Sequence, residues 1–288
     1  TKGFEDISIR IGAFDSDRRI IAEALRADII GFTATSPMMT HARHLAARIK
    51  GRNSNIKIVF GGTHPSVAVE STLEDRNIDW IVRGEGEVTF YELVKAIQEN
   101  APIENIKGLS YSKDGQVVHN PDRELIEKID TIPFPARDLL NQERFIQKFL
   151  YSRDVKLRSA WMLSSRGCPF RCTYCASCRV WTRKWRARSA ENIMGEICEL
   201  IDRYKIEHVD FADDTFTINK ERVRKFCELL LTNNIKISWA CNARVDIIDK
   251  EFLKIMKSAG CTELWMGVES GSPVILKEIK KDIKITEV

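Results

Sequence analysis

Short apolar runs alternate with amphipathic stretches in the first third of the chain. Runs rich in β-branched and aromatic residues, bounded by polar positions, are typical of buried parallel strands and lie at 28–33, 56–61 and 79–84. Apolar residues then recur at i, i+3, i+4 and i+7 over 42–49 and again over 90–97, as in amphipathic helices. This alternation predicts a doubly wound, Rossmann-like α/β domain over residues 1–105.

Residues 158–288 repeat the alternation of strands and helices. Strand-like runs are expected at 161–165, 208–212, 237–244 and 264–271. A helical stripe follows each run, and Ser189 is the expected N-cap of the first helix. Four such βα units predict a partial parallel barrel, in which ligands bind at the carboxyl ends of the strands.

Residues 106–157 join the two predicted domains. The hairpin signal Lys113-Asp114-Gly115 lies between two strand-like runs, at 108–112 and 116–119. The stretch 132–140 contains two prolines and is therefore not expected to form a regular helix. We predict an ordered strap whose apolar residues pack against a domain.

Both ends of the chain resemble cut ends. The sequence begins at Thr1 without a methionine, runs almost directly into the strand-like residues 7–11, and stops at Val288 soon after a helix-like segment. We therefore expect a fragment, in which the first strand of the N-terminal domain is missing and only four of the barrel units are present.

Charge and cysteine use narrow the functional class. The 45 Lys and Arg residues nearly balance the 41 Asp and Glu residues, and the formal charge of +4 indicates no nucleic-acid partner. No apolar run is long enough for a membrane span, and no signal peptide is visible. All eight cysteines lie at or after Cys168, unlike those of a secreted disulfide scaffold. We predict a cytoplasmic protein, because a reducing compartment suits free thiols.

Three of these cysteines form a C-x3-C-x2-C motif at Cys168, Cys172 and Cys175. A structural zinc site requires four protein ligands, and this motif supplies three. A [4Fe–4S] cluster offers one position per iron, so three thiolates leave one iron open to a substrate or cofactor. The motif favours a cluster used for chemistry. A zinc knuckle, or a chance group to which Cys178 adds a nearby thiol, stays open at this point.

The motif, with an aromatic residue before its last cysteine, resembles the signature of radical SAM enzymes. The resemblance implies that Cys168, Cys172 and Cys175 ligate a [4Fe–4S] cluster and that Tyr174 packs near the adenine of S-adenosylmethionine (SAM). In that family SAM chelates the open iron, and an electron from the cluster cleaves SAM to a 5′-deoxyadenosyl radical. The resemblance also implies that the partial barrel is of the (β/α)6 type.

Polar residues follow the later barrel strands: Asp213 and Asp214, then Arg244, then Glu269 and Ser270. Carboxylates there can accept hydrogen bonds from an ammonium group or a ribose, and Arg244 can pair with a carboxylate. The segments FADDTF, NARVD and GVESGS resemble the SAM-contacting positions of cobalamin-dependent radical SAM enzymes. A helix-capping role for the Asp pair and a barrel salt bridge for Glu269 remain alternatives.

A basic run with two tryptophans lies at 179–188. Such a run is found on surfaces that bind nucleic acid, but a solvated segment covering the cluster is the favoured interpretation. The four later cysteines fall within predicted helices and strands, and we expect small buried residues at Cys198, Cys227, Cys241 and Cys261.

Glycines and small hydroxyl residues gather where the three N-terminal strands end. Glycine lets backbone approach a ligand closely, and hydroxyl groups donate hydrogen bonds, although tight turns use the same residues. The loops resemble those of the cobalamin-binding domain that precedes many radical SAM domains, through GGTHPS and RGEGE over about residues 5–100. The resemblance implies cobalamin contacts from Thr33, Thr35, Ser36, Gly61, Gly62, His64, Arg83, Gly84, Glu85 and Gly86. The loop that carries an axial histidine in some relatives is absent, so we expect His64 to line the pocket or stabilise its own loop.

Together the two resemblances imply a cobalamin-dependent radical SAM enzyme, with a [4Fe–4S] cluster, SAM and cobalamin as cofactors. Methylation of an unactivated carbon is the favoured reaction, on a small-molecule or lipid-like substrate, with flavodoxin or ferredoxin as electron donor. Alternatives are cobalamin-dependent ring formation or rearrangement, and a non-catalytic cobalamin or zinc binding module. A tRNA methylthiotransferase is disfavoured, because such enzymes need further cysteines in the first domain and none precedes Cys168.

Overall fold

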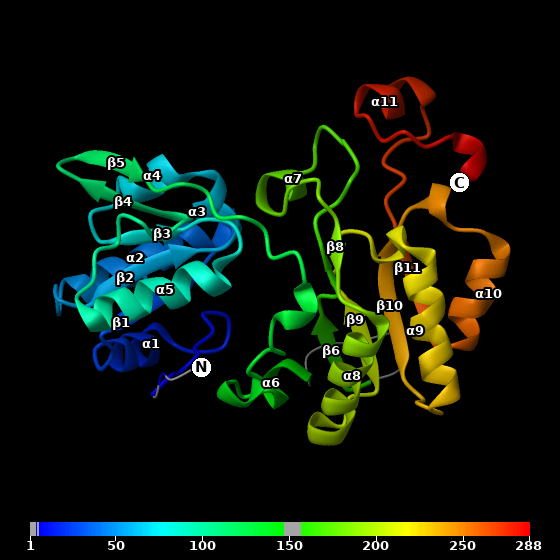
Figure 1. Cartoon of the computed structure of the whole chain (residues 1–288), viewed down its shortest axis with the longest axis horizontal. Coiled ribbons are helices and arrows are strands. Elements are labelled where there is room, and N and C mark those ends of the chain that lie inside the picture. Colours follow the sequence, from blue (N-terminus) through cyan, green and yellow to red (C-terminus); the bar gives the residue numbers. More distant parts are fainter. Residues whose placement is uncertain (1–3, 5, 147–156) are drawn as a thin grey trace. The chain divides into compact units, whose positions relative to one another are not determined.

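The computed structural model of the chain describes residues 4, 6–146 and 157–288. Contacts divide the described residues into two units, Arg10–Ile126 and Glu127–Val288, the latter together with the described residues before Arg10 (Figure 1). We call them the N-terminal unit and the C-terminal unit. The end of the expected linker, residues 147–156, lies outside the described residues.

The N-terminal unit is built on a five-stranded sheet of order β1-β2-β3-β4-β5. β1, β2 and β3 are parallel, whereas β4 pairs antiparallel with both β3 and β5. The predicted parallel strands are confirmed, and each is shorter than the apolar run that predicted it. The strands are β1 (Ile29–Thr33), β2 (Lys57–Gly61), β3 (Trp80–Val82), β4 (Leu109–Lys113) and β5 (Gln116–His119).

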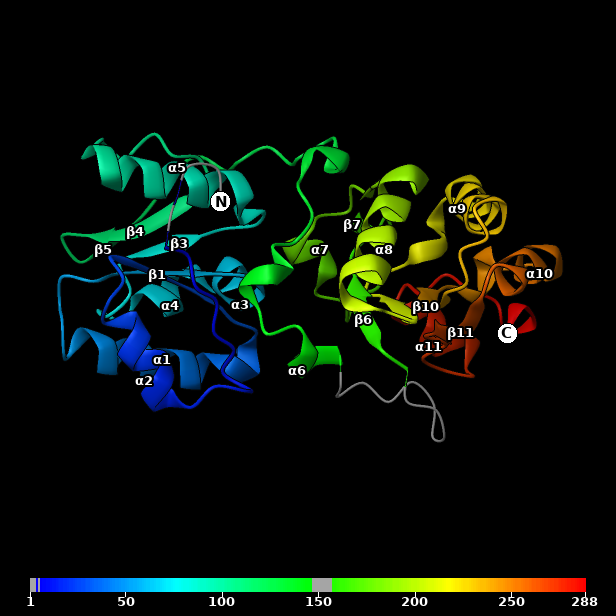
Figure 2. The ribbon, with the colours of Figure 1, turned by 90° about the horizontal axis from the view of Figure 1, so that it is seen from below.

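Helices cover both faces of this sheet, which makes three layers (Figure 2). Alternate residues of β2 point to opposite faces, so Ile58 and Phe60 pack against α1, α2 and α4, whereas Val59 packs on the α5 side. The apolar stripes expected at 42–49 and 90–97 lie on α2 and α5. The helices are α1 (Asp17–Ala24), α2 (Met39–Lys50), α3 (Thr63–Val67), α4 (Val69–Leu73) and α5 (Gly86–Glu99).

Two expectations for this half are corrected. The hairpin β4–β5, assigned to the join, extends the sheet instead, so the unit runs to Ile126 rather than to residue 105. Its turn is as predicted, because Asp114 and Gly115 both have positive φ, as a two-residue hairpin loop requires. Residues 7–11 form no strand, since the N–H groups of Phe14 and Asp15 both bond to the Ile11 carbonyl and the chain turns there.

The C-terminal unit contains a parallel sheet of order β11-β10-β9-β6, as four βα units of a barrel require. A short antiparallel pair, β7 with β8, accompanies it. Two strands are shifted from their predicted bounds. β6 begins before Trp161, and β11 ends at Met266, which leaves Glu269 in a loop. The strands are β6 (Ser159–Met162), β7 (Ser165–Arg166), β8 (Arg186–Ala187), β9 (His208–Phe211), β10 (Ser238–Ala243) and β11 (Cys261–Met266).

Three long helices cover one face of this sheet (Figure 2). Ser189, Asn219 and Asp249 cap them by accepting a bond from the N–H three residues on. Between helices and sheet lies a buried aromatic group, in which the Phe211 and Phe216 rings stack at 4.3 Å. The helices of the unit are α6 (Glu143–Ile146), α7 (Ser177–Val180), α8 (Ala190–Tyr204), α9 (Lys220–Thr232), α10 (Lys250–Ser258) and α11 (Pro273–Glu278).

The proline-containing strap is held on α8 by buried charge. Glu196 of α8 is 1% exposed and pairs with both Arg137 of the strap and Arg188, which are each 7% exposed. The Phe134 ring lies against Gly195, where an added Cβ would come within 3.4 Å. The predicted packing of the strap is thus confirmed at Phe134. The prediction of a solvated basic run is wrong for Arg186 and Arg188, which are buried.

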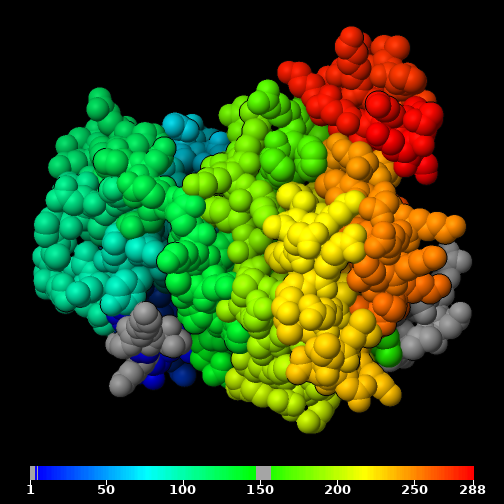
Figure 3. Space-filling model, turned by 45° about the vertical axis from the view of Figure 1, so that its right-hand side comes forward, coloured from blue at the N-terminus to red at the C-terminus, as the bar shows by residue number. Residues whose placement is uncertain are grey.

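The last helix, α11, lies with the carboxyl ends of the strands and not beside α8–α10 (Figure 1). Its Leu276 packs in a separate small cluster with Val245 and Ile283. In the space-filling view this segment, in red, lies at the upper right, above the orange residues of α10 (Figure 3). Among the helices of the described residues, none has the length and apolar character needed to cross a bilayer.

Candidate functional site

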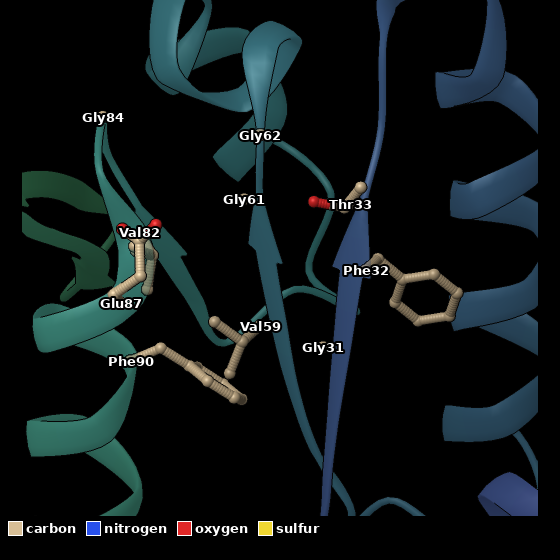
Figure 4. Close-up of a pocket in the computed structure, with 11 residues that line it drawn as sticks. Gly31, Phe32, Thr33, Val59, Gly61, Gly62, Val82, Gly84, Glu87 and Phe90 are labelled. Atoms are coloured by element: carbon tan, nitrogen blue, oxygen red, sulfur yellow. The ribbon is translucent and has the colours of Figure 1, made fainter. Parts of the chain in front are cut away.

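A pocket of about 430 Å³ lies at the carboxyl ends of β1, β2 and β3 and beside the start of α5 (Figure 4). Backbone and apolar side chains form most of its wall, and Glu87 is the charged residue among them. Val59 and Phe90 point toward one another across it, whereas the Phe32 ring points to the other side of the sheet. The lining residues are Gly31, Phe32, Thr33, Val59, Gly61, Gly62, Val82, Gly84, Gly86, Glu87 and Phe90.

Two glycines of the pocket adopt backbone conformations that other residues rarely adopt. Gly62 has φ +87°, and an added Cβ would lie 3.1 Å from Thr33 Oγ1. Gly84 has φ +66° but nothing within 4 Å of an added Cβ. Both positions favour glycine through φ, and at Gly62 the missing side chain also leaves room beside Thr33.

The cobalamin contacts expected from the sequence separate into two groups. Thr33, Gly61, Gly62, Gly84 and Gly86 line the pocket. The others are absent from its wall: Thr35, Ser36, His64, Arg83 and Glu85.

The side chains of Arg83 and Glu85 brace the end of the unit. Arg83 donates to the carbonyls of Leu109 and Asn120, at 2.8 and 2.7 Å. The buried Glu85 carboxylate accepts the Ile126 N–H at 2.7 Å. Both side chains thus have partners within the protein, and their expected contacts with cobalamin stay a prediction. The sequence around Arg83 and Glu85 could not predict these bonds, because the partner residues lie at least 26 positions away.

Ser36 and His64 form an exposed hydrogen-bonded pair, with 2.8 Å between Ser36 Oγ and His64 Nδ1. The His64 N–H also bonds to the Ala34 carbonyl at 3.1 Å. These bonds tie the loop after β1 to the start of α3. They agree with the expectation that His64 stabilises its own loop.

The pocket has lining residues that the sequence analysis missed. Gly31 lies inside a strand, where an added Cβ would come within 3.5 Å of the Phe90 ring. A glycine inside a strand often marks such a close approach, so Gly31 could have been predicted from the sequence as a pocket residue. In the sequence Phe90 is one member of a helical stripe, and the residue is 37% exposed.

The three motif cysteines lie in one loop between β7 and α7. Gly167, just before Cys168, has φ +83°, and an added Cβ would lie 2.4 Å from the Lys184 carbonyl oxygen. Cys175 is exposed, whereas Cys168 and Cys172 are half-buried, and burial raises the pKa of the Cys168 thiol. No three His, Cys, Asp or Glu side chains of the described residues gather around one metal ion. A [4Fe–4S] cluster binds each thiolate to a different iron, so the three cysteine sulfurs need not converge on one metal atom.

Asp213 is fully buried, and neighbours satisfy both of its carboxylate oxygens. The Ser164 N–H and hydroxyl each donate to it at 2.6 Å, and the Ser165 hydroxyl donates at 2.5 Å. Arg222 lies 3.8 Å away, and burial of the carboxyl raises the pKa of Asp213. Asp213 therefore joins the end of β9 to the residues just before the cysteine loop, and the SAM contact expected from the sequence stays a prediction.

Asp214 and Arg244 lie next to the cysteine loop. The exposed Asp214 accepts a bond from Ser177, the first residue of α7. The buried Arg244 guanidinium bonds to both oxygens of Asp246, at 2.9 and 3.0 Å, and lies 3.6 Å from the centre of the Phe170 ring. Arg244 thus pairs with a carboxylate, that of Asp246, and these partners and the Lys281 carbonyl hold it beside the cysteine loop, while its contact with SAM stays a prediction.

Tyr174 and Glu269 are brought together by a residue that the sequence analysis missed. Lys281 Nζ lies 3.2 Å from Tyr174 Oη and 3.2 Å from Glu269 Oε1. Burial, and then the bond to Glu269, raise the pKa of Tyr174, while the bonds from Tyr174 and Lys281 lower the pKa of Glu269. Ser270 shapes the turn before α11, since its Oγ accepts the Ser272 N–H at 3.1 Å.

The remaining cysteines differ in burial. Cys227 and Cys241 are buried, as expected, and burial raises the pKa of Cys227 to about 12. Cys198 and Cys261 are half-buried, so full burial was wrong for them. Cys178 lies near the motif, with its sulfur 3.7 Å from the Cys175 carbonyl oxygen.

Comparison with known proteins identifies both units. Residues 5–94 match the B12 binding domain, and residues 162–288 match the radical SAM superfamily. The chain therefore belongs to the radical SAM superfamily, among the members that carry a B12-binding domain in front of the radical SAM domain. The cofactors of these domains are cobalamin, SAM and a [4Fe–4S] cluster, and radical SAM enzymes require an electron donor.

Named relatives and a solved structure extend this similarity. The chain is 38% identical over 269 residues to "Uncharacterized methyltransferase PH0819" of Pyrococcus horikoshii, covering 93% of this chain and 57% of that protein. It is 31% identical to an anaerobic magnesium-protoporphyrin IX monomethyl ester cyclase of Rubrivivax gelatinosus, over 91% of this chain and 47% of that enzyme. The structure of the cobalamin-dependent radical enzyme OxsB with aqua-cobalamin and SAM bound matches with a TM-score of 0.80 and 25% identity. That match covers 94% of this chain and 40% of OxsB, so the chain spans about half the length of the relatives that it matches.

Proposed function

We propose that the protein is a cobalamin-dependent radical SAM enzyme that methylates an unactivated carbon. The observation that carries this proposal is the C-x3-C-x2-C loop at the carboxyl end of a parallel sheet, in a chain that also has a B12-binding domain. The name of the Pyrococcus relative, a methyltransferase, favours methyl transfer. When bound, the cofactors supply an electron from the cluster, a 5′-deoxyadenosyl radical from SAM, and a methyl carrier in cobalamin.

The donor set of the cysteine loop fits a [4Fe–4S] cluster with one open iron. Cys168, Cys172 and Cys175 are the proposed ligands, each a free thiol within one short loop. The positive φ of Gly167, and the Lys184 carbonyl that a Cβ there would meet, fix where this loop starts. Cys178 is left outside the ligand set, because its sulfur bonds back to the Cys175 carbonyl oxygen.

Three side chains around the loop are the proposed SAM contacts. Tyr174 is 52% exposed and offers its ring, and Asp214 and Glu269 offer carboxylates at the strand ends. Asp213, Arg244 and Ser270 do not contact SAM in this proposal but hold the loops in place. Asp213 and Arg244 are buried among their partners and Ser270 accepts the Ser272 N–H, whereas the carboxylates of Asp214 and Glu269 belong to exposed residues.

The pocket of the N-terminal unit is the proposed site for the nucleotide tail of cobalamin. Its volume of about 430 Å³ is within the range of small-molecule sites. Gly31, Gly61 and Gly62 leave backbone at its surface, and Val59 and Phe90 offer apolar faces to an aromatic base. The cradle fits because an added Cβ at Gly62 would occupy the space beside Thr33.

Anaerobic reconstitution tests the two-cofactor proposal. The protein is loaded with iron, sulfide and hydroxocobalamin, and its ultraviolet–visible spectrum, iron content and dithionite-driven cleavage of SAM are measured. We expect a brown, oxygen-sensitive cluster, bound corrin and formation of 5′-deoxyadenosine. Replacing Cys168, Cys172 and Cys175 by Ala should abolish cluster and cleavage, whereas the matched control Cys178→Ala should retain both. Folded wild-type protein that binds no corrin or cleaves no SAM contradicts the proposal and leaves a binding module without catalysis.

Ring formation without methyl transfer is a second candidate function. The cyclase relative, at 31% identity, is the observation that favours it. The two reactions differ in products, since methyl transfer through cobalamin yields S-adenosylhomocysteine together with a methylated product. Cleavage of SAM to 5′-deoxyadenosine and methionine, without S-adenosylhomocysteine, would favour cyclisation.

The partners follow from the same chemistry. We propose a flavodoxin or ferredoxin as the one-electron donor, and a small-molecule or lipid-like substrate rather than nucleic acid. The net charge of +4 supports the exclusion of nucleic acid. We propose a cytoplasmic location, because all eight cysteines are free thiols and a reducing compartment keeps them so.

A further inference from the structure

The segment that follows α11 is attached to the cysteine loop. The Thr173 N–H donates to the Ile279 carbonyl at 3.0 Å, and Arg244 donates to the Lys281 carbonyl at 2.8 Å. Lys281 then extends its ammonium group to the Tyr174 hydroxyl. The bonds at Thr173 and Tyr174 join this segment to a loop more than one hundred residues earlier, and the bond from Arg244 holds the backbone of Lys281.

Lys281 is an unusual lysine, because only 8% of its surface is exposed. A lysine is rarely buried to this extent unless its charge is paired. Glu269 supplies the pairing charge, 3.2 Å from Nζ, and the Tyr174 hydroxyl accepts a second bond at the same distance. The ammonium therefore joins the loop after β11 to the cysteine loop.

The backbone around Glu269 is shaped to deliver its carboxylate to Lys281. Glu269 has φ +69°, which a residue with a side chain rarely adopts unless its surroundings hold it there. At Gly267 an added Cβ would lie 2.3 Å from Glu269 Oε1, so a side chain there would displace the carboxylate from this position. Both features support a built arrangement rather than a chance surface pair.

The two ends of the Tyr174 side chain have different surroundings. Its hydroxyl is held by Lys281 and Glu269, while 52% of the residue stays exposed. A ring held in one orientation loses little further freedom when a ligand packs on it. The free face of a fixed ring is what an adenine base requires for stacking.

We propose that Lys281 is a positioning residue, which fixes the Tyr174 ring through the Lys281–Glu269–Tyr174 bonds so that the ring receives the adenosyl part of SAM. This inference rests on the proposed function, because it takes SAM as the ligand of the loop. Lys281 acts through Tyr174 and makes no contact with SAM of its own.

The test uses the reconstituted full-length protein and SAM as the probe. Four variants are compared with wild type: Lys281→Met, Lys281→Arg, Tyr174→Phe and the double variant Tyr174→Phe/Lys281→Met. The matched control is Lys277→Met, an exposed lysine of α11. The Kd of SAM is measured by equilibrium dialysis, iron and sulfide content by chemical assay, and the change in the electron paramagnetic resonance spectrum of the reduced cluster when SAM is added.

We expect Lys281→Met to weaken SAM binding about tenfold, the fold-change of one lost bond to a charged group, with iron and sulfide content unchanged. Tyr174→Phe should weaken it to a similar extent, and the double variant should be no worse than either single variant, because both remove the same link. Lys281→Arg should restore most of the affinity, and Lys277→Met should match wild type. The spectral change caused by SAM should shrink in Lys281→Met and return in Lys281→Arg.

Four outcomes would overturn the inference. Unchanged affinity in Lys281→Met removes the role of Lys281. Additive losses in the double variant mean that Lys281 contacts SAM directly. Loss of iron and of folded protein in both Lys281→Met and Lys281→Arg means a purely structural role. Wild-type protein that holds its cluster but binds no SAM overturns the proposed function itself.

Discussion

The two units of the chain build their candidate sites from different materials. In the N-terminal unit the pocket is made of backbone, glycines and apolar side chains, and Glu87 is the charged residue among those that line it. In the C-terminal unit charged side chains surround the cysteine loop, and most of them are already bonded to each other, as in Arg244–Asp246 and Lys281–Glu269.

This difference predicts how each site fails. A surface made of backbone tolerates the loss of a side chain but not the addition of one, because an added Cβ fills the space or strains φ. A surface made of paired charges fails when one partner is removed, because the other is left buried without compensation. The following substitutions test this contrast, from the largest expected effect to the smallest.

Glu196→Gln should cause the largest loss. It leaves Arg137 and Arg188 buried without a countercharge, which costs roughly 3–5 kcal/mol of unfolding free energy. Denaturant unfolding measures this loss. The matched control is Glu199→Gln on the same helix, whose partner Arg203 is 52% exposed, and it should cost less than about 1 kcal/mol. Equal effects of the two substitutions would show that burial of the charge does not matter here.

Asp213→Asn should cost about 2–3 kcal/mol, since it turns one acceptor oxygen into a donor beside Ser164 and Ser165 and removes the charge facing Arg222. Its exposed neighbour serves as control: Asp214→Asn should change stability by less than about 1 kcal/mol. The midpoint of urea unfolding, measured for both variants, shows the difference in stability. If Asp213→Asn is as stable as wild type but has lost SAM binding, Asp213 is a ligand contact after all.

Gly62→Ala should cost about 1–2 kcal/mol and weaken cobalamin binding, because it adds both a strained φ and a contact with Thr33. Gly84→Ala shares the positive φ but meets nothing within 4 Å, so it should cost only about 1 kcal/mol and weaken cobalamin binding less than Gly62→Ala. Thermal unfolding and corrin absorbance report the two quantities. Should both variants bind cobalamin alike, the space beside Thr33 is not part of the site.

Ser36→Ala should have the smallest effect, below about 0.5 kcal/mol, because its bond to His64 is exposed to water. Cobalamin affinity should also stay unchanged, since neither residue lines the pocket. His64→Ala is the companion variant, and corrin absorbance during titration is the measurement. A drop in affinity of about tenfold in both variants would place this pair in the binding site.

Local patterns in the sequence predicted the elements of both units well. The stripes on α2, α5, α8, α9 and α10 and the cap at Ser189 depend on neighbours within a few residues, so the sequence contains their causes. The ends of β6 and β11 were wrong, because a strand ends where its partner strand stops pairing. The hairpin was found as a hairpin, but its place in the N-terminal sheet required knowing that β4 pairs with β3.

The sequence by itself determined which chemistry this protein can perform, because the spacing of Cys168, Cys172 and Cys175 and the glycines at the strand ends lie within short stretches of chain. Only the tertiary structure decided which polar side chains remain available for a ligand. Asp213, Asp214, Arg244 and Glu269 look alike in sequence, yet Asp213 and Arg244 are buried among partners of their own. Lys281 reaches Tyr174 across 107 positions, and no local pattern marks it. The physical reason is that burial and charge pairing depend on distant residues, whereas helix periodicity, capping and ligand spacing depend on near ones.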